Sequence, residues 1–529
     1  MDKINTNSEK NNSLLLHALL LILSLFLIYF TLAKGLPNEF SYNIPWLKEI
    51  MGQAFANEEI LKFSRLFYNP VLHLGSLLFH SYGLIFSFFT FCNFIVFSIG
   101  SLLLLGASYR SVLFSFMFFI CNEKLLLSGT GSSFCYSLLL VGFALDFKRR
   151  NIAFYIFVLS SLWIYPIATL MLLFYRWVCQ VRDRQWLDAG ITSAITVLLL
   201  LFKKFVLGLD GLEGEFFSSY QSLQQIFQDP YFFGESMVNM AQRPNWISLL
   251  QSILTDNTKI GTTLFSLSPL GSMRFLSLTL IFLALILERD SMIESFKHCR
   301  LALFAALGLY TLALIAAFKL YYPSRYIMGP VFLIVNYLVM EAVWNLKKFR
   351  VTVPACAIVT LVFYSSFSSF YPALITRDSY LGYLSLSTRE LDLPRLEDYF
   401  NSDELQNSVY MASPRLSAWL MLVTNRHAPY LSYKFVDKNY ELRRRSSQLW
   451  KTYTAGTLLE LKTQCRQAGA DFFILETELL QAIKNGDWQR IGRNLVVPHR
   501  QDLDTKQLPI IDYEVSEGIK LGSLEILKC

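Results

Sequence analysis

Ionisable side chains concentrate in the stretch 35–82, which lies between two long apolar runs of the chain. Four carboxylates and three cations are found there: Glu39, Glu49, Glu58, Glu59, Lys48, Lys62 and Arg65. A carboxylate can act as a general base or as a ligand of a divalent metal ion. Charged residues of both signs also form ordinary solvated surfaces. The sequence leaves both interpretations open, a chemically active loop and a charged face.

The element that must position these carboxylates is an expected helix within 44–67. Its apolar residues recur at four-residue spacing, Trp46 with Ile50 in one row and Leu47 with Met51 in the next. This pattern predicts an amphipathic helix that lies on a membrane interface, with Lys48 and Glu49 on its polar face.

A second candidate group lies at 319–326, where an apolar run ends, a proline turns the chain and the next run begins. Tyr322 and Arg325 would lie there at the depth of the lipid headgroups. A guanidinium binds a lipid phosphate or pyrophosphate through paired, charge-assisted hydrogen bonds. The alternative is an arginine that extends to the interface without binding a ligand.

The composition excludes an ordinary soluble enzyme. The chain has 529 residues, 53% of them hydrophobic and 16% charged, and the apolar residues form long uncharged runs. Such runs predict a polytopic membrane protein. The net charge of +7 is modest and comes largely from basic loops, so no nucleic-acid partner is implied. The run 14–33 is interpreted as a retained anchor and not as a removed signal.

About 11 transmembrane helices are expected at 14–33, 83–106, 111–127, 133–147, 152–165, 166–180, 188–207, 272–288, 301–320, 326–345 and 351–371. Pro166 marks a break between two short ones. Basic residues of the short loops fall on one side, which is therefore the cytoplasmic side, and the N-terminus lies there. The loops 35–82 and 208–271 and everything after Tyr371 then face outward. The turn Gly129-Thr-Gly131 is expected at the outward end of a span.

The transmembrane part is expected to cover 1–371, and 372–529 is expected to form a soluble extracytoplasmic α/β domain. Strands are predicted at 408–412, 470–475 and 494–497, and helices near 414–423 and 457–468. The segments 508–511 and 524–527 are interpreted as a closing hairpin. The cysteines form no C-x-x-C pair, and free thiols are favoured over a bridge between Cys465 and Cys529.

The chain resembles the GT-C class of integral-membrane glycosyltransferases. The likeness rests on the acidic first loop, Pro70-Val-Leu-His-Leu-Gly, the turn Tyr322-Pro-Ser-Arg-Tyr326, Val409-Tyr-Met-Ala-Ser-Pro414 and Gly469-Ala-Asp-Phe-Phe-Ile-Leu475. The resemblance implies a polyprenyl-phosphate sugar donor and an acidic residue in the first loop that acts as base or metal ligand. Glu39 occupies that place, where the class carries Asp.

The leading hypothesis is a glycosyltransferase of the bacterial inner membrane that acts on an envelope or lipid acceptor at the outward face. Glu39 would be the base, Glu58 or Glu59 a substrate-positioning or divalent-metal group, and Arg325 with Tyr322 would hold the lipid phosphate. Two alternatives stay open, a non-catalytic scaffold or lipid-binding protein of this fold and a lipid or polymer transporter. The near absence of ionisable residues within the spans disfavours transport.

Overall fold

The structure is a computed structural model, and it describes residues 40, 43–52, 68–106, 108–121, 129–206, 282, 285–315, 324–346, 399, 402, 408–413, 416–417, 428–429, 448–484, 518–521 and 524–529. The expected spans 14–33 and 351–371 and the loop 208–271 lie outside these residues.

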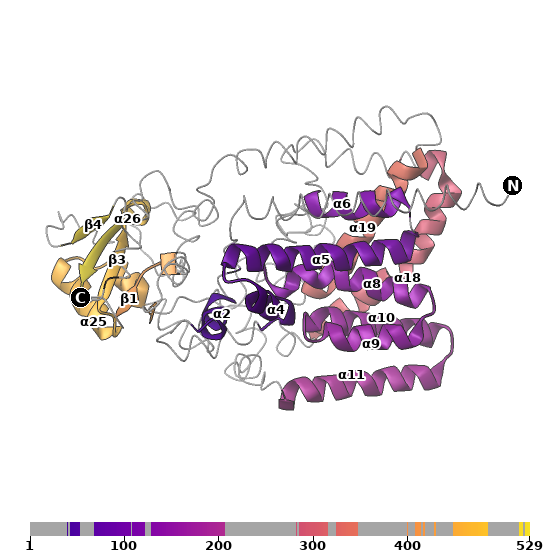
Figure 1. Ribbon diagram of the computed structural model, residues 1–529, viewed down its shortest axis with the longest axis horizontal. Coiled ribbons are helices and arrows are strands. Elements are labelled where there is room, and N and C mark those ends of the chain that lie inside the picture. The colour runs from indigo at the N-terminus through magenta and orange to yellow at the C-terminus, as the bar shows by residue number, and fades with distance from the viewer. Residues whose placement is uncertain are drawn as a thin grey trace.

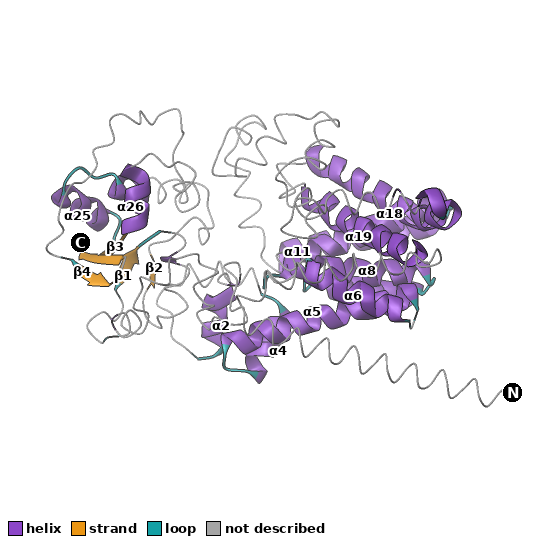
Figure 2. Cartoon of the chain, turned by 90° about the horizontal axis from the view of Figure 1, so that it is seen from above, coloured by secondary structure: helices purple, strands orange, loops and turns teal. Residues whose placement is uncertain are grey.

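The described part of the chain up to 346 is helical (Figure 1). Its elements are α2 (Ile44–Ile50), α4 (Pro70–Leu78), α5 (Tyr82–Leu105), α6 (Tyr109–Cys121), the 3₁₀ helix η2 (Gly131–Phe134), α8 (Cys135–Phe147), α9 (Asn151–Ser161), α10 (Pro166–Arg182), α11 (Trp186–Val206), α18 (Arg289–Ile315) and α19 (Ser324–Leu346). α5, α6 and α8 run side by side in both views (Figures 1 and 2). Most start or end within a few residues of the predicted spans.

α18 differs from the prediction, because it begins at Arg289 and not near 301. Residues 289–300 contain neither proline nor glycine, so nothing in the sequence interrupts the helix there. The buried side chain of Met292 fixes this first part of α18 to the helical core.

Among the described helices, α5 is long enough and apolar enough to cross a membrane by itself. Shorter apolar helices accompany it, and the expected number of about 11 spans is not confirmed. α9 has 11 residues, which at about 1.5 Å per residue reach only about half of a hydrocarbon core. The break expected at Pro166 is present, because α9 ends at Ser161 and α10 begins with that proline.

Close helix packing depends on small residues. A Cβ on Gly100 of α5 would lie 3.0 Å from the backbone nitrogen of Val141 in α8, and one on Gly142 of α8 would lie 2.4 Å from Leu172 Cδ2 of α10. Phenylalanine rings fill the space between α5 and α6, as in the stacked pair Phe97 and Phe118, whose centroids are 4.4 Å apart.

Two ends of the helical part can be distinguished. The basic end carries Arg110, Asp146, Asn151, Arg176, Gln180, Thr192 and Glu341. The loop end carries α2, α4 and η2, beside the first residues of α5, at the left end of the helical part in Figure 1. Three contacts give the direction of α6 between these ends: Arg110 pairs with Glu341, the Phe114 ring contacts Tyr337, and Phe118 contacts Tyr136. α6 and α19 are therefore antiparallel, and the N-terminal ends of α8 and α19 both lie toward the loop end.

The C-terminal part contains a five-stranded mixed sheet of order β2-β1-β3-β5-β4. Its elements are β1 (Val409–Met411), β2 (Ala428–Pro429), α25 (Leu458–Gln467), β3 (Phe472–Glu476), α26 (Thr477–Lys484), β4 (Ile519–Leu521) and β5 (Leu524–Lys528). β1 is parallel to β2 and β3, whereas β5 is antiparallel to β3 and β4. This part has its own core, in which Leu461, Phe473 and Leu479 pack together.

Several C-terminal predictions agree with these elements and one needs correction. β1, β3 and α25 lie where two strands and a helix were expected. The hairpin is formed by β4 with β5, so its first strand is 519–521 and not 508–511. A connection of two residues between β4 and β5 is the length typical of a hairpin, which the predicted spacing was not. The predicted strand 494–497 and the segment 508–511 lie outside the described residues.

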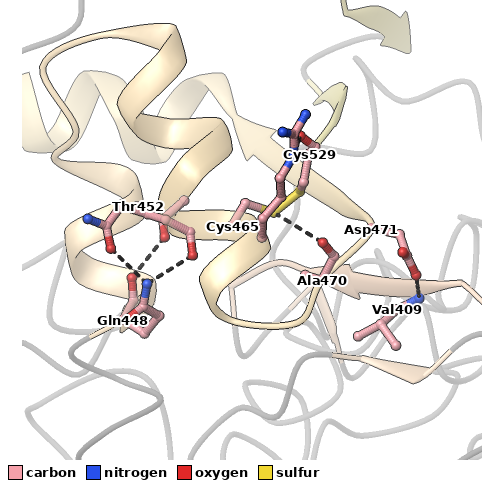
Figure 3. The surroundings of a disulfide bond; sticks show 9 residues. Val409, Gln448, Thr452, Cys465, Ala470, Asp471 and Cys529 are labelled. Carbon is pink, nitrogen blue, oxygen red and sulfur yellow. Dashed lines mark hydrogen bonds between the residues drawn. A yellow bond between two sulfur atoms is a disulfide. The ribbon is translucent and has the colours of Figure 1, made fainter.

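A disulfide joins Cys465 of α25 to Cys529 after β5 (Figure 3), with a Cα to Cα distance of 5.7 Å. The preference for free thiols was therefore wrong. The two cysteines are 64 residues apart in the chain, and the antiparallel pairing of β5 with β3 brings Cys529 beside the C-terminal turn of α25. Arg466 Nε donates a hydrogen bond to the Cys529 carbonyl oxygen and fixes the same corner.

Candidate functional site

The predicted site residues lie largely outside the described part of the chain. This holds for Glu39, Glu58, Glu59 and Tyr322. Arg325 is the second residue of α19, and its backbone is described but its side chain is not. Their described neighbours are Phe40, which follows Glu39, and Tyr326, which follows Arg325.

α2, the described part of the expected interface helix, packs inside the protein and does not offer an apolar face to a membrane. Trp46, Leu47 and Lys48 are at most 2% exposed, whereas Glu49 is exposed. Both apolar rows of this short helix therefore pack inside, and Lys48 is covered with them. The part 53–67 of the expected interface helix lies outside the described residues.

At the loop end, α4 exposes an apolar face, as α9 and α11 do elsewhere in the helical part. Leu74, Leu77 and Leu78 are about half or more exposed, and Leu84 at the start of α5 continues this apolar surface. Gly75 on the opposite side lies against α5, because a Cβ there would be 3.3 Å from Ile85 Cγ2. α4 thus presents leucines outward at the loop end while its other side packs on α5.

The first loop is attached to the segment Gly129–Ser133, which we call the glycine turn. Asn43 Nδ2 donates to the carbonyl oxygen of Gly129 at 2.9 Å and to that of Phe40 at 3.3 Å. The Phe40 ring packs so tightly on the turn that a Cβ on Gly129 would lie 2.7 Å from its Cδ2 atom, and Gly129 has a φ of +71°. The residue next to Glu39 is therefore held against the glycine turn.

The same turn contacts the cap of α4. Asn69 caps this helix by accepting a hydrogen bond from the Val71 backbone nitrogen at 2.9 Å. A Cβ on Gly131 would lie 3.6 Å from Asn69 Nδ2 and 2.5 Å from the Ile164 carbonyl oxygen. Only glycine fits at 131 without movement of the backbone near Ile164.

α5 fixes the far side of the turn through buried hydrogen bonds. Asn93 Nδ2 donates to the Ser133 carbonyl oxygen at 3.0 Å, and Ser137 Oγ donates to Asn93 Oδ1 at 2.5 Å. These bonds hold η2 and the first turn of α8 against α5, because each joins groups that are shielded from water.

α19 reaches the same place from its N-terminal end. A Cβ on Gly329 would lie 3.1 Å from Cys135 Sγ, at the first residue of α8, and Tyr326 is buried in the same core. Gly329 follows Arg325 by about one helical turn. Phe40, which follows Glu39, and Gly329, four residues after Arg325, therefore pack on the two ends of Gly129–Cys135.

Four side chains at the loop end have a buried polar atom that finds no hydrogen-bond partner in the described residues: Asn43 (Oδ1), Trp46 (Nε1), Asn69 (Nδ2) and His73 (Nδ1). The Tyr68 ring lies between two of them, with its centroid 5.6 Å from the ring centroids of both Trp46 and His73. Buried polar atoms are nearly always bonded, and exceptions mark places where water or a ligand binds.

The buried ammonium group of Lys48 adds an electrostatic feature to the loop end. Burial lowers the pKa of this side chain to about 8, because a charged group loses its hydration inside the protein. A lysine with such a pKa exchanges its proton near neutral pH.

Sequence reasoning missed Asn43 and Asn69, although one of them carries a signal. Asn69 precedes Pro70 and an apolar run, a pattern that predicts a helix cap. Asn43 has no such signal, because its partner Gly129 is 86 residues away. The turn at Gly129–Gly131 was predicted, but its contacts were not.

Within the described residues, no group of three or more His, Cys, Asp or Glu side chains could hold a metal ion. His73 and His80 belong to no such group. The carboxylates that the sequence assigns to a divalent ion lie outside this part of the chain, so the prediction of a metal remains a prediction.

No family model matches the chain, and no curated protein matches it. Its fold is similar to solved structures of an oligosaccharyltransferase from Archaeoglobus fulgidus. The complex with Zn and sulfate has a TM-score of 0.44 and 12% identity over 89% of this chain and 69% of the other. The complex of the same archaeal protein, AglB, with an inhibitory peptide and a dolichol-phosphate has a TM-score of 0.45 and 12% identity over 88% and 69%. At these scores, the likeness assigns no activity to the chain.

Proposed function

We propose that the protein is a membrane glycosyltransferase of the GT-C type, which transfers a sugar from a polyprenyl-phosphate carrier to an envelope or lipid acceptor at the loop end. The observation that carries this proposal is the convergence of two distant segments. Phe40, next to Glu39, packs on Gly129, and Gly329, one turn after Arg325, packs on Cys135. We infer that this convergence brings an acid–base group and a phosphate-binding cation to the loop end, and the transfer needs both.

In the proposed reaction, a hydroxyl oxygen or amide nitrogen of the acceptor attacks the anomeric carbon of the sugar. The bond from that carbon to the phosphate oxygen breaks, and its electron pair stays on the leaving phosphate. Glu39 takes the proton that the acceptor loses, as a general base. Arg325, with Tyr322 beside it in the sequence, stabilises the negative charge that grows on the phosphate.

A divalent ion at this end would be held by Glu58 or Glu59, and it would supply further positive charge beside the phosphate. The proposal does not require it, because Arg325 and the carboxylate of Glu39 already account for charge and proton transfer.

The proposal places the chain in the bacterial inner membrane, with the N-terminus in the cytoplasm and the loop end and C-terminal domain outside. The disulfide between Cys465 and Cys529 supports the outward location of that domain, because disulfides persist mainly in oxidising compartments.

The test compares Glu39→Gln with Glu49→Gln in the purified full-length protein. Glu39→Gln keeps the size of the side chain but cannot accept the proton, so turnover should fall by about 10²- to 10⁴-fold. Glu49 is exposed on α2, and its variant should retain wild-type turnover. Arg325→Ala should weaken both carrier binding and turnover, because the phosphate is present before and during the reaction.

A lipid-binding protein without catalysis is the second candidate, and the exposed leucines of α4 favour it. This candidate predicts that polyprenyl phosphate binds while no sugar is transferred, and that Glu39→Gln and Arg325→Ala both complement a deletion strain fully.

A further inference from the structure

We propose that the glycine turn at the start of η2 and α8, together with the Asn69 amide, binds a lipid-linked phosphate group. This inference deepens the proposed function, on which it rests for the identity of the lipid. It adds a second anchor to the one assigned to Arg325, and it is made of backbone and neutral side-chain donors.

The backbone supplies the first part of the site. η2 runs without interruption into α8, so that Gly131–Phe147 forms one continuous apolar helix. The N–H groups of its first residues, Gly131 and Ser132, find no acceptor among the described residues, as is usual at a helix N-terminus. Such a terminus carries partial positive charge and binds phosphate groups readily.

Asn69 supplies the second and independent part. Its Oδ1 atom is used as the cap of α4, whereas its Nδ2 atom has no partner among the described residues. The side chain is 1% exposed, and Nδ2 lies 3.6 Å from the position that a Gly131 Cβ would take. A buried amide donor is thus directed at the first residue of the helix, where an acceptor oxygen of a ligand would satisfy it.

Hydroxyl groups line the accessible side of the turn. Thr130 and Ser132 are half-buried, and their Oγ atoms are 2.7 Å apart. Ser133 Oγ is already committed to the Thr130 carbonyl oxygen at 2.8 Å. A phosphate at this helix terminus would therefore lie beside these hydroxyl groups as well as the backbone N–H groups.

The location of the turn favours a lipid as the source of the phosphate. Asn69 directly precedes α4, whose exposed leucines form an apolar surface that continues to Leu84 of α5. A helix with such a face at the end of a membrane protein lies beside acyl chains. A phosphate whose chain extends along this face would bring its oxygens to the glycine turn.

The test uses the full-length protein in detergent or nanodiscs and measures the dissociation constant of polyprenyl phosphate without any turnover. Asn69→Asp keeps the capping oxygen but replaces the free donor with a negative oxygen, so the dissociation constant should rise about 10- to 100-fold. Asn151→Asp is the matched control, because it adds the same charge at the exposed basic end and keeps the oxygen that accepts from Arg176 Nη2. It should leave binding unchanged.

Ser132→Asp is a second variant that tests the site even if Asn69→Asp fails to fold. A carboxylate at a helix N-terminus stabilises the helix but competes with a bound anion. This variant should therefore fold at least as well as the wild type and bind polyprenyl phosphate at least 10-fold more weakly.

Three ligands distinguish the sources of the phosphate. If Asn69→Asp and Ser132→Asp weaken the binding of polyprenyl phosphate and inorganic phosphate does not compete with it, the bound phosphate is that of a lipid headgroup. Competition by inorganic phosphate with the same sensitivity to Asn69→Asp assigns it to free phosphate. The uncharged polyprenol should bind weakly, and neither variant should change its dissociation constant.

Wild-type affinity of both folded variants for polyprenyl phosphate would overturn the phosphate site, whatever the effect of Glu39→Gln on turnover. An equal loss of polyprenol binding would also overturn it. If the variants weaken phosphate binding but the wild-type protein transfers no sugar, the proposed glycosyltransferase activity is refuted. The phosphate site then still stands.

Discussion

The two ends of the helical part differ in how their buried polar side chains are paired. At the basic end, charges are paired: Arg176 contacts Asp146 and donates to Asn151 at 2.8 Å, and Arg110 pairs with Glu341. A second set of hydrogen bonds there connects Tyr155, Thr192 and Gln180 at 2.7 to 3.3 Å. These contacts join α8, α9, α10 and α11 to one another and α6 to α19.

At the loop end, polar atoms of Asn43, Trp46, Asn69 and His73 are buried without hydrogen-bond partners, and these side chains belong to no ion pair of the described residues. Buried atoms without such a partner also occur at the basic end, but apart from Ser108 Oγ they belong to the ion-paired side chains of Arg110, Arg176 and Glu341. Leaving a donor or acceptor unpaired costs about 1–3 kcal/mol, so a fold selected only for stability would pair them. The ion pairs of the basic end hold helices together, and our proposals assign the unpaired polar atoms of the loop end to a ligand.

The largest effect is expected from breaking the ion pair at the basic end. Glu341→Ala removes a carboxylate that is 4% exposed and leaves Arg110 without its partner, so the free energy of unfolding should fall by about 3–5 kcal/mol. The measurement is thermal or denaturant unfolding of the purified protein. The double variant Arg110→Met with Glu341→Met should restore much of the loss, because no unpaired charge remains.

The binding of polyprenyl phosphate is a second readout for Glu341→Ala. The folded fraction of Glu341→Ala should bind polyprenyl phosphate as the wild type does, since the ion pair lies at the other end of α6 and α19. Wild-type stability of Glu341→Ala would show that the basic end does not fix these helices.

The C-terminal disulfide should have the next largest effect. Replacing Cys465 and Cys529 together with Ser should lower the free energy of unfolding of this part by about 2–4 kcal/mol, because the bridge closes a long loop in the unfolded chain. The variant Cys92→Ser, at a free cysteine, is the control.

The same disulfide tests on which side of the membrane the C-terminal part lies. When protein taken from cells is denatured and treated with a maleimide, two additional thiols should react only after reduction. Immediate reaction of both thiols would contradict an oxidising location and, with it, the proposed orientation of the loop end.

Elements that depend on local sequence were the ones that could be predicted. Apolar runs indicated most helices, Pro166 indicated the start of α10, and buried apolar runs indicated β1 and β3. Span number was a weaker inference, because helices such as α9 are too short to cross a bilayer alone.

Features that depend on distant pairing could not be predicted. A disulfide requires two cysteine Cβ atoms to approach closely, which a separation of 64 residues does not reveal. The burial of α2 depends on Tyr68 and on the glycine turn, and the amphipathic pattern of its sequence is the same for a membrane interface and for a protein core. The free donor of Asn69 likewise follows from its packing on Gly131.

The smallest expected effect concerns charge at the loop end, where Lys48 is buried. Its pKa is lowered to about 8 in the folded protein, whereas an unfolded lysine has a pKa of about 10.4. Between these two pH values the unfolded chain binds more protons than the folded one, so the free energy of unfolding should rise with pH, by an amount on the order of 2 kcal/mol. Above about pH 10.4 this contribution should be constant, and below about pH 8 the cost of burying the charge should be fully present.

Lys48→Met should remove this rise, because the side chain no longer titrates, while Lys451→Met at an exposed position should leave it in place. The measurement is the unfolding midpoint of the detergent-solubilised protein from pH 7.5 to 10.5. If the unfolding midpoint depends on pH in the same way in wild type and Lys48→Met, the surroundings of charged Lys48 supply as much free energy as the side chain loses in hydration. The loop end would then compensate its buried charge as the basic end does, and the contrast between the two ends would be confined to the unpaired side chains of Asn43, Trp46, Asn69 and His73.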